Sequence, residues 1–195
     1  MIIEPDYLLN AYGSGYFPMA EPDTGEIYWY SPDPRAVFDL KKFHIPKSLE
    51  KKLKTNIFRF KINNDFEAVI RECSKRDETW ISEDIIESYS ALNKLGFAYS
   101  FETYFEDKLA GGLYGVALKG AFFGESMFHI VRDASKAALV FLMENLSQCG
   151  YTLLDTQYMT DHLKKFGAQE IPRKDYLIQL QAALEVEPQK FNINV

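Results

Sequence analysis

The fold class follows from residues 109–128, which read LAGGLYGVAL-KG-AFFGESMF. Two runs rich in apolar and aromatic side chains flank the dipeptide Lys119-Gly120, an arrangement typical of two antiparallel strands joined by a tight turn. A third such run, Ala98 to Tyr104, comes before them and is connected through Glu106-Asp107-Lys108, which also favours a turn. We therefore predict a three-stranded antiparallel meander in the middle of the chain.

Helical periodicity surrounds this meander on both sides. The expected helices are 6–12, a basic helix from Pro46, 65–73, 83–95, Ala134–Leu146 with Asp133 as its N-cap, Asp161–Phe166 and one from Pro172; the other expected strands are 28–30, 58–62 and 152–157. This order predicts an α/β (α+β) fold with a mixed, largely antiparallel sheet flanked by helices. We expect residues 1–62 to form a small amino-terminal subdomain and residues 63–195 to form the catalytic domain.

The composition favours a cytoplasmic protein. The chain has 195 residues, of which 47% are hydrophobic, yet no apolar stretch approaches the roughly 20 residues that a membrane span needs. The first residues, Met1 to Asp6, lack the basic region and apolar run of a signal peptide. Cys73 and Cys149 are too few and too isolated for a metal site or a disulfide scaffold. We expect no metal and no membrane attachment.

The net charge of −6 is distributed unevenly. Residues 41–61 hold eight Lys or Arg and one acidic residue, a local charge of +7, so the rest of the chain carries −13. Within this segment Lys47, Lys51 and Lys54 follow Pro46 at spacings of four and three, which places them on one face of a helix. The residues alone allow two interpretations, a solvated helix face or a surface that binds phosphates.

Three polar side chains fall in segments that we expect to be buried strands: Glu125, Asp155 and Gln157. A buried carboxylate is costly unless it is paired or shifted in pKa, which makes these residues functional candidates. Asp155 and Gln157 should share one face of a regular strand, about 7 Å apart. Phe122 and Glu125 should face opposite sides, unless Gly124 hosts a bulge that brings both to one site.

Seven strings occur in one order along the chain. They are Gly15-Tyr16-Phe17-Pro18, Trp29-Tyr30-Ser31-Pro32-Asp33-Pro34-Arg35, Thr79-Trp80-Ile81, Gly111-Gly112-Leu113-Tyr114-Gly115-Val116, Gly124-Glu125-Ser126-Met127-Phe128, Leu154-Asp155-Thr156-Gln157, and His162-Leu163 through Gly167-Ala168. Together, from about Leu8 to Tyr176, they resemble the leucyl/phenylalanyl-tRNA–protein transferase family.

The resemblance implies a GNAT-like fold and a specific aminoacyl transfer. Leu or Phe, and less well Met, would pass from aminoacyl-tRNA to the α-amino group of proteins that begin with Arg or Lys, which feeds the N-end rule degradation pathway. Because the donor ester is already activated, we expect no cofactor; the enzyme must orient two substrates and stabilise an oxyanion. The resemblance also implies a short form that lacks the family's usual amino-terminal extension, and we expect a monomer.

The resemblance assigns Asp155, Gln157 and Glu125 to catalysis. Asp155 would accept a hydrogen bond from the Gln157 amide and orient it, so that the Gln157 carbonyl oxygen can hold the attacking amine. Glu125 would bind the cationic end of the acceptor. The structural alternatives are that Asp155 caps a turn, that Gln157 merely ends the strand, and that Glu125 pairs with an Arg or Tyr in the core.

Substrate-binding positions follow from the same resemblance. Those of the aminoacyl-adenosine and acceptor pocket are Trp80, Leu113, Phe122, Leu154 and Met19, and those of the tRNA acceptor-stem patch are Lys47, Lys51 and Lys54. Core packing is the alternative for each apolar residue. Met19 stands where the family usually has Trp, so adenine stacking would be weaker or would fall to Trp29 or Tyr30. Arg35 would either reach a phosphate or pair with Asp33.

Two other classes of protein compete with this interpretation. A GNAT-type N-acyltransferase with an acyl-CoA donor would need a Gly-rich loop before a helix to bind the pyrophosphate, whereas Ile130-Val131-Arg132-Asp133 precedes the longest helix. A non-catalytic RNA-binding module would use the basic helix and would have no need for Asp155 or Glu125 in an apolar setting.

Overall fold

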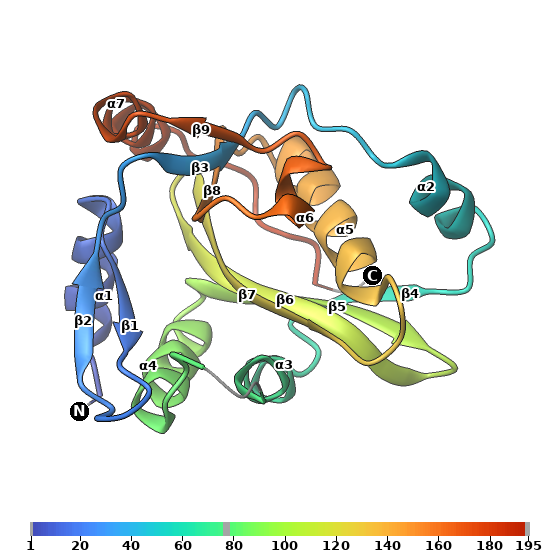
Figure 1. Cartoon of the computed structure of the whole chain (residues 1–195), viewed down its shortest axis with the longest axis horizontal. Coiled ribbons are helices and arrows are strands. Elements are labelled where there is room, and N and C mark those ends of the chain that lie inside the picture. Colours follow the sequence, from blue (N-terminus) through green and yellow to red (C-terminus); the bar gives the residue numbers. More distant parts are fainter. Residues whose placement is uncertain (1, 76–78, 194–195) are drawn as a thin grey trace.

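The computed structural model of this chain describes residues 2–75 and 79–193. A seven-stranded sheet of order β4-β5-β6-β7-β8-β3-β9 forms its centre, with α5 on one face and α3 and α4 on the other (Figure 1). The strands are β1 Phe17–Ala20, β2 Ile27–Tyr30, β3 Arg35–Phe38, β4 Arg59–Ile62, β5 Ala98–Phe105, β6 Lys108–Leu118, β7 Ala121–His129, β8 Leu153–Gln157 and β9 Gln169–Ile171. The helices are α1 Pro5–Gly13, α2 Lys47–Leu53, α3 Phe66–Ser74, α4 Glu83–Lys94, α5 Ala134–Cys149, α6 Asp161–Lys164 and α7 Arg173–Leu184.

The predicted meander is confirmed as β5, β6 and β7, which pair antiparallel in sequence order. The sheet is antiparallel throughout except where β7 and β8 run parallel, because the chain crosses over between them through α5. The prediction of a mixed, largely antiparallel sheet flanked by helices is therefore confirmed. Each face carries its own core: α1, α3, α4 and α7 pack against one, and α5 and α6 against the other.

Several local predictions differ from the structure. Strands β1, β3 and β9 were not predicted, and α5 extends beyond Leu146 to Cys149. Asp133 occupies the predicted N-cap position of α5, but its φ is 71° and its side chain makes no capping hydrogen bond. The carboxylate instead accepts from Lys136 Nζ at 2.8 Å and Lys52 Nζ at 3.2 Å. These two lysines therefore offset the charge that was expected to cap the helix.

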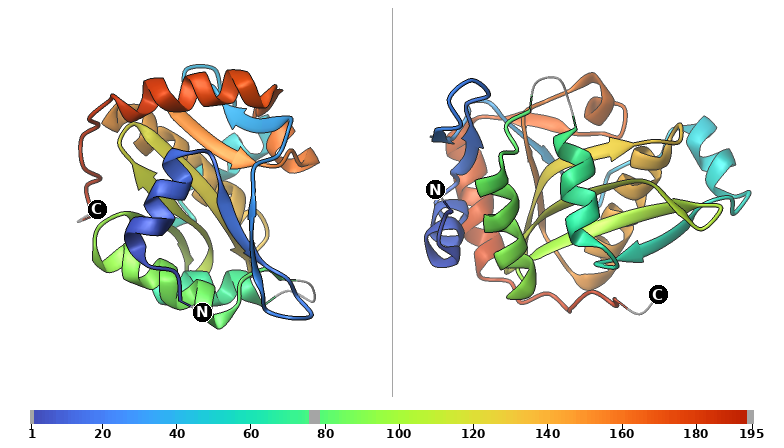
Figure 2. Two further views of the ribbon diagram at one scale, coloured as in Figure 1. Left: turned by 90° about the vertical axis from the view of Figure 1, so that its left-hand side faces the viewer. Right: turned by 90° about the horizontal axis from the view of Figure 1, so that it is seen from below.

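The first part of the chain contributes to two sheets. Strands β1 and β2 form a separate antiparallel ribbon, which stands with α1 beside the main sheet (Figure 2). Tyr7 of α1 meets Trp29 of β2 edge to face, with ring centroids 5.3 Å apart. Strands β3 and β4, also before residue 63, pair within the seven-stranded sheet. The domain division at residue 62 stays a prediction. Among the described residues, no helix is long and apolar enough to cross a membrane.

Candidate active site

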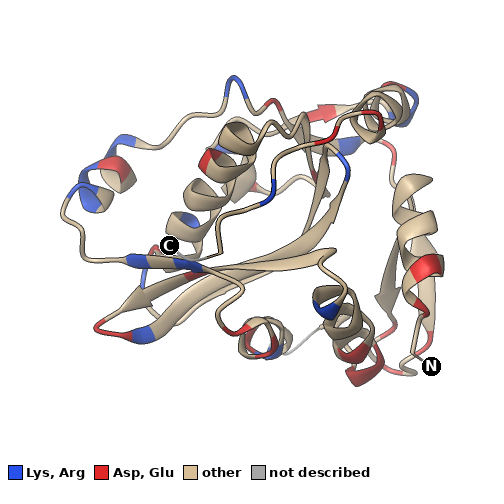
Figure 3. Ribbon diagram, turned by 180° about the vertical axis from the view of Figure 1, so that it is seen from behind, with Lys and Arg blue, Asp and Glu red and all other residues tan. Residues whose placement is uncertain are grey.

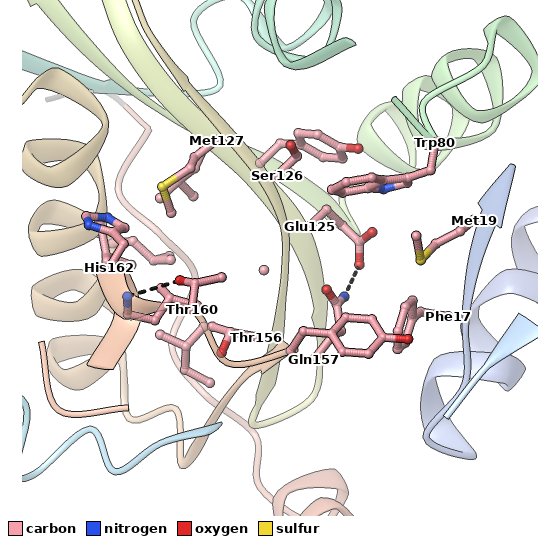
Figure 4. A pocket seen from close by; sticks show the side chains of 18 residues that line it. Phe17, Met19, Trp80, Glu125, Ser126, Met127, Thr156, Gln157, Thr160 and His162 are labelled. Atoms are coloured by element: carbon pink, nitrogen blue, oxygen red, sulfur yellow. Dashed lines mark hydrogen bonds between the residues drawn. The ribbon is translucent and has the colours of Figure 1, made fainter. Parts of the chain in front are cut away.

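A cavity of about 400 Å³ opens where β7 and β8 separate. The two strands pair only from Ala121 to Phe123 and from Leu153 to Asp155, and the residues beyond this pairing line the cavity. Figure 4 shows Glu125 and Gln157 between two ends of the cavity. Met127 and His162 lie toward one end, and Phe17, Met19 and Trp80 lie toward the other. The first end is apolar, formed by Leu113, Met127, Leu139, Leu142, Leu154 and Leu163; the second is formed by Phe17, Met19, Trp80 and Tyr158.

Irregular strand pairing on both sides of the cavity determines where the side chains of Glu125 and Gln157 point. On β7 the pairing shifts between Tyr114 and Gly115 of β6, which leaves Glu125 without a cross-strand partner. Gly115 is required here because a Cβ atom would collide with the carbonyl oxygen of Phe123. The predicted irregularity near Gly124 is thus confirmed, but its expected consequence is wrong. Phe122 is fully buried in the core on the α5 side and does not line the cavity.

A second irregularity separates Asp155 from Gln157. The pairing of β3 with β8 shifts between Ala36 and Val37, so Thr156 is the extra residue, and Gln157 adopts a φ of 62°. Such left-handed backbone is uncommon for a residue other than glycine and occurs often at functional sites. The expectation that the side chains of Asp155 and Gln157 project side by side from one regular face is therefore wrong.

Asp155 is fully buried and makes an ion pair with Arg35. Its two carboxylate oxygens accept from Arg35 Nε at 2.9 Å and Nη2 at 2.7 Å, and also from the Tyr176 hydroxyl at 2.7 Å and the Gln157 backbone N–H at 2.9 Å. Burial disfavours the guanidinium charge, yet the hydrogen bonds and charge of Asp155 raise the pKa of Arg35. Asp155 therefore orients the backbone of Gln157, not its side chain.

Arg35 is itself fully buried, which neither expected role anticipated. Its guanidinium carbon lies 4.9 Å from the ring centroid of Phe17 and 4.4 Å from that of Tyr176. Asp33, the expected partner, instead accepts from the Arg173 backbone N–H at 3.0 Å. A bidentate pair enclosed by aromatic rings fixes the position of β8 relative to β3.

Glu125 is the residue that orients the Gln157 side chain. Gln157 Nε2 donates to Glu125 Oε1 at 2.8 Å, so the Gln157 carbonyl oxygen points away from this bond (Figure 4). The Tyr12 hydroxyl donates to the same oxygen at 2.6 Å, and the Tyr89 hydroxyl donates to Oε2 at 3.2 Å. The two hydroxyl groups also contact each other. The Glu125 carboxylate is therefore held on three sides.

The environment of Glu125 raises the pKa of its carboxyl group towards neutral pH. Burial raises the pKa of Glu125 to about 7, and the charge of Asp155 adds to this, although hydrogen bonds from Tyr12, Gln157 and Tyr89 act in the opposite direction. Burial, followed by the charge of Glu125, raises the pKa values of both tyrosines well above their usual value. The tyrosines consequently stay protonated and act as hydrogen-bond donors.

The structure brings together most of the residues that the sequence singled out. Trp80, Leu113, Leu154 and Met19 line the cavity with Glu125 and Gln157, whereas Asp155 and Phe122 lie behind it. The sequence analysis missed Tyr12 and Tyr89, because both fall on apolar helix faces where an aromatic residue indicates core. Leu139 and Leu142 share a face of the longest helix, and that spacing could have predicted part of the wall.

Lysines cover a surface that begins beside the apolar end of the cavity. We call the exposed lysines of α2 and α6, of the C-cap that follows each of these helices, and of the segment between β3 and α2 the cationic surface: Lys41, Lys42, Lys47, Lys51, Lys54, Lys164 and Lys165. The segments meet where the His44 backbone N–H donates to Phe166 O at 3.1 Å. His162 on α6 lines the cavity, and burial, then the charges of Lys136 and Lys165, lower its pKa. Of the predicted lysines, Lys47 and Lys51 lie on α2 and Lys54 is its C-cap, and none of the three lines the cavity. Helix α2 stands apart from β7 and β8 (Figure 1).

Comparisons with known proteins identify the family of this chain. A family model described as leucyl/phenylalanyl-tRNA protein transferase matches residues 37–181, and one for the amino-terminal domain of the same transferase matches residues 1–33. The chain is 48% identical to the leucyl/phenylalanyl-tRNA–protein transferase of Salinibacter ruber, over 95% of this chain and 82% of that protein. It is 49% identical to those of Gloeobacter violaceus, over 97% of both chains, and Rubrobacter xylanophilus, over 96% and 98%.

A solved structure, that of L-PGS from Bacillus licheniformis, matches with a TM-score of 0.44 and 16% identity over 82% of this chain and 55% of that one. The apolar cavity with its central carboxylate–amide pair suits an aminoacyltransferase, and the family models match most of the chain. The chain belongs to the leucyl/phenylalanyl-tRNA–protein transferase family.

Proposed function

We propose that this protein transfers Leu or Phe, and less well Met, from aminoacyl-tRNA to the α-amino group of proteins that begin with Arg or Lys, which directs them to N-end rule degradation. The observation that carries this proposal is the Gln157 amide, held by Glu125 in the middle of an apolar cavity. The names of the relatives support the donor, the tRNA and the protein acceptor.

The apolar end of the cavity takes the donor side chain. Its walls are mostly leucine, and a volume of about 400 Å³ accommodates a Leu, Met or Phe side chain. Burying a charged side chain there would be far more costly than burying an apolar one. Among apolar donors, one methylene changes binding by about 1–3 kcal/mol, so Leu and Phe are preferred over Ala by filling the cavity.

The amino group of the acceptor attacks the ester carbonyl beside Gln157. The Gln157 carbonyl oxygen accepts a hydrogen bond from the attacking amine and orients its lone pair toward the carbonyl carbon. The new C–N bond forms, the C–O bond to the terminal ribose breaks, and the ribose oxygen takes up the proton that the amine nitrogen loses. An α-amino group has a pKa of about 7.7–8.0, so a useful fraction is already neutral near pH 7. A modest proton acceptor therefore suffices.

Glu125 supplies negative charge beside the attacking amine. With a pKa of about 7, its carboxylate is largely ionised only above neutrality, and a cationic acceptor residue would favour the ionised form. Asp155 acts at a distance, through its bonds to Arg35 and to the Gln157 backbone. We therefore assign Asp155 as a positioning residue and Glu125 and Gln157 as the residues that touch substrate.

The tRNA lies along the cationic surface. Lys47, Lys51 and Lys54 contact the phosphates of the acceptor stem, and Trp80 and Met19, at the aromatic end of the cavity, lie between the terminal adenosine and the acceptor. Trp29 does not supply the stacking surface, because it packs against Tyr7 of α1. Tyr30 stacks on Phe17, with centroids 6.2 Å apart, and stays available for this role.

Three broader points belong to the same proposal. The sheet is GNAT-like, which the order of its elements supports: an antiparallel meander, a crossover helix and one parallel strand pair. The protein acts as a monomer in the cytoplasm. It uses no cofactor, because the donor ester is already activated.

A transfer assay with purified components tests the proposal. Leu-tRNA and Phe-tRNA should donate to an Arg-initiated peptide at least tenfold faster than Ala-tRNA, and an Arg-initiated peptide should be used at least tenfold better than a Glu-initiated one, since each tenfold step needs only about 1.4 kcal/mol. Acetyl-CoA should give no product. Turnover with acyl-CoA in the absence of tRNA would instead establish the N-acyltransferase alternative.

A further inference from the structure

A second hollow lies next to the catalytic cavity, on the β1–β2 ribbon. This groove of about 870 Å³ lies between the ribbon and the start of the chain, and we call it the acidic groove. Its lining includes Ile2, Glu4, Tyr7, Glu26, Tyr28 and Trp29. Three of these side chains are unusually exposed for their type: Tyr7 at 61%, Ile2 at 50% and Tyr28 at 46%. A large exposed apolar patch with a charged rim is typical of a binding surface.

The charged side chains of this region are all acidic. Residues 1–34 contain six Asp or Glu and no Lys or Arg, and Asp84 of α4 also lines the acidic groove. Figure 3 shows acidic positions around the amino terminus and basic positions concentrated on the far side, around α2. A polyanion such as tRNA is attracted to the cationic surface and repelled by the acidic groove. The groove consequently suits a cationic partner.

The acidic groove adjoins the site of chemistry. Met19 of β1 lines the catalytic cavity and Tyr28 of β2 lines the acidic groove, and the two are direct cross-strand partners. Side chains opposite each other in an antiparallel pair have Cβ atoms about 4.5–5.5 Å apart. An extended chain advances about 3.3–3.6 Å per residue. A peptide that leaves the catalytic cavity past Met19 therefore reaches Tyr28 within about two residues.

The side chains of the groove suit a basic residue. Tyr28 donates its hydroxyl hydrogen to Glu26 Oε2 at 2.7 Å, which fixes a carboxylate beside an exposed aromatic ring. Tyr7 and Trp29, which also line the groove, meet edge to face. Lys or Arg can lay its aliphatic stem on such rings and bring its charge to the carboxylates.

The geometry points to a docking site for the acceptor polypeptide: the acidic groove binds Lys or Arg residues that follow the acceptor's first residue. This inference rests on the proposed function and adds a second determinant of acceptor choice, located outside the catalytic cavity. The charges on the two sides of the molecule thus sort the substrates, with tRNA on the cationic surface and acceptor protein on the ribbon.

Peptide kinetics test the docking site. Two eight-residue acceptors that begin with Arg differ at positions four and six, with Lys in one peptide and Glu in the other. For the wild type, the Lys peptide should have the lower KM by about fivefold, the scale of exposed charge pairs. Glu4→Gln with Glu26→Gln should remove most of this difference, and Glu4→Lys with Glu26→Lys should reverse it. The KM for aminoacyl-tRNA and kcat should stay unchanged in the Gln variant.

A matched control removes two exposed carboxylates elsewhere, by Glu106→Gln at the β5–β6 turn and Glu170→Gln in β9. Its net charge equals that of the Gln variant, and it should keep the fivefold difference. If the folded Gln variant kept the difference in KM between the two peptides, the docking site would be overturned. The same would follow if the wild type formed a dimer that the Lys variant dissociates while the KM values of both peptides stay unchanged. If no peptide of either kind accepts an amino acid from wild type, the proposed function itself fails.

Discussion

Glu125 combines two properties that oppose each other. In the proposed reaction it lies beside the attacking amine, where a negative charge helps to bind a cationic acceptor, yet burial raises its pKa to about 7. The folded protein consequently holds this proton to higher pH than the unfolded chain, in which the pKa is near 4.5. The associated stability is fully present below about pH 4.5 and is lost as the pH rises to about 7. A functional residue here lowers the stability of the fold at neutral pH.

Replacement of Glu125 by Gln should therefore stabilise the protein while it impairs transfer. The amide keeps hydrogen bonds to the tyrosines but carries no charge to bury. We expect Glu125→Gln to raise the free energy of unfolding at pH 8 by roughly 3 kcal/mol, at about 1.4 kcal/mol for each unit of pKa, with the gain vanishing near pH 4.5. The KM for an Arg-initiated peptide should rise. Thermal melts at the two pH values, beside the peptide kinetics, check this; equal stability of both proteins at pH 8 would contradict it.

Asp155 presents the opposite case, a buried carboxylate that stabilises the fold through its partner. A purely catalytic Asp155, as the resemblance implies, would let Asp155→Ala lower activity without affecting the fold. The structure contradicts this expectation, because the substitution leaves Arg35 buried without its counter-charge. Loss of one member of a buried pair costs about 3–5 kcal/mol.

The contribution of the Arg35–Asp155 pair to stability can be separated from its contribution to transfer by replacing both residues. Asp155→Ala should unfold at a markedly lower temperature than wild type, whereas Arg35→Met combined with Asp155→Leu should regain most of the lost stability. The double variant should still transfer at least tenfold more slowly, about 1.4 kcal/mol in the barrier, since the Gln157 backbone N–H lacks its acceptor. The loss should appear in kcat. Melting curves measure the recovered stability, and single-turnover rates measure the loss of transfer. Full activity of the stable double variant would exclude a positioning role for Asp155.

At the scale of strands and helices, the elements with a clear period were predictable and the short or irregular ones were not. Strands β5, β6 and β7 are eight to eleven residues long, so alternation and turns identified them. Strands β3 and β9 have four and three residues, too few to display a period, and both depend on partners far along the chain. The bulge at Thr156 was hidden for the same reason, because register is a property of pairs of strands, whereas Gly124 had already indicated the bulge on β7.

Gly115 gives a test of the bulge that presents Glu125. Its α-carbon packs against the backbone of Phe123 and the ring of Phe122, so Gly115→Ala should force β6 and β7 apart. We expect the free energy of unfolding to fall by about 1–3 kcal/mol, the usual cost of overpacking a core. Transfer activity should fall by more than the unfolded fraction of the variant accounts for. Gly13→Ala is the control, since its added methyl group would make ordinary contacts with Leu118 and Leu184. Normal activity of folded Gly115→Ala would show that the bulge is not needed.

For the whole molecule, the net charge of −6 conceals its functional division. The cationic surface gathers lysines from α2, from α6 and from the segment between β3 and α2. The sequence showed the first and last of these, because they are neighbours along the chain. It could not show that α6, more than a hundred residues later, meets them through Phe166. The chemistry of the site was likewise visible as isolated carboxylates, whereas their partners depended on tertiary contacts.

Salt dependence of tRNA binding distinguishes a working phosphate surface from a merely solvated helix. Lys47→Ala, Lys51→Ala and Lys54→Ala combined should weaken tRNA binding and reduce the slope of log K against log salt by up to about three charges. Lys54 already pairs with Glu50 at 2.6 Å, so the reduction should fall nearer two. Reaction with an aminoacyl-adenosine donor, which carries no acceptor stem, should be unchanged because the three lysines lie away from the cavity. The control is Lys94→Ala, Lys108→Ala and Lys174→Ala, three exposed lysines outside the cationic surface, which match the loss of charge. If both triple variants reduce the salt slope of tRNA binding equally, net charge alone governs tRNA binding. If neither variant changes the slope, α2 has no role in binding the donor tRNA.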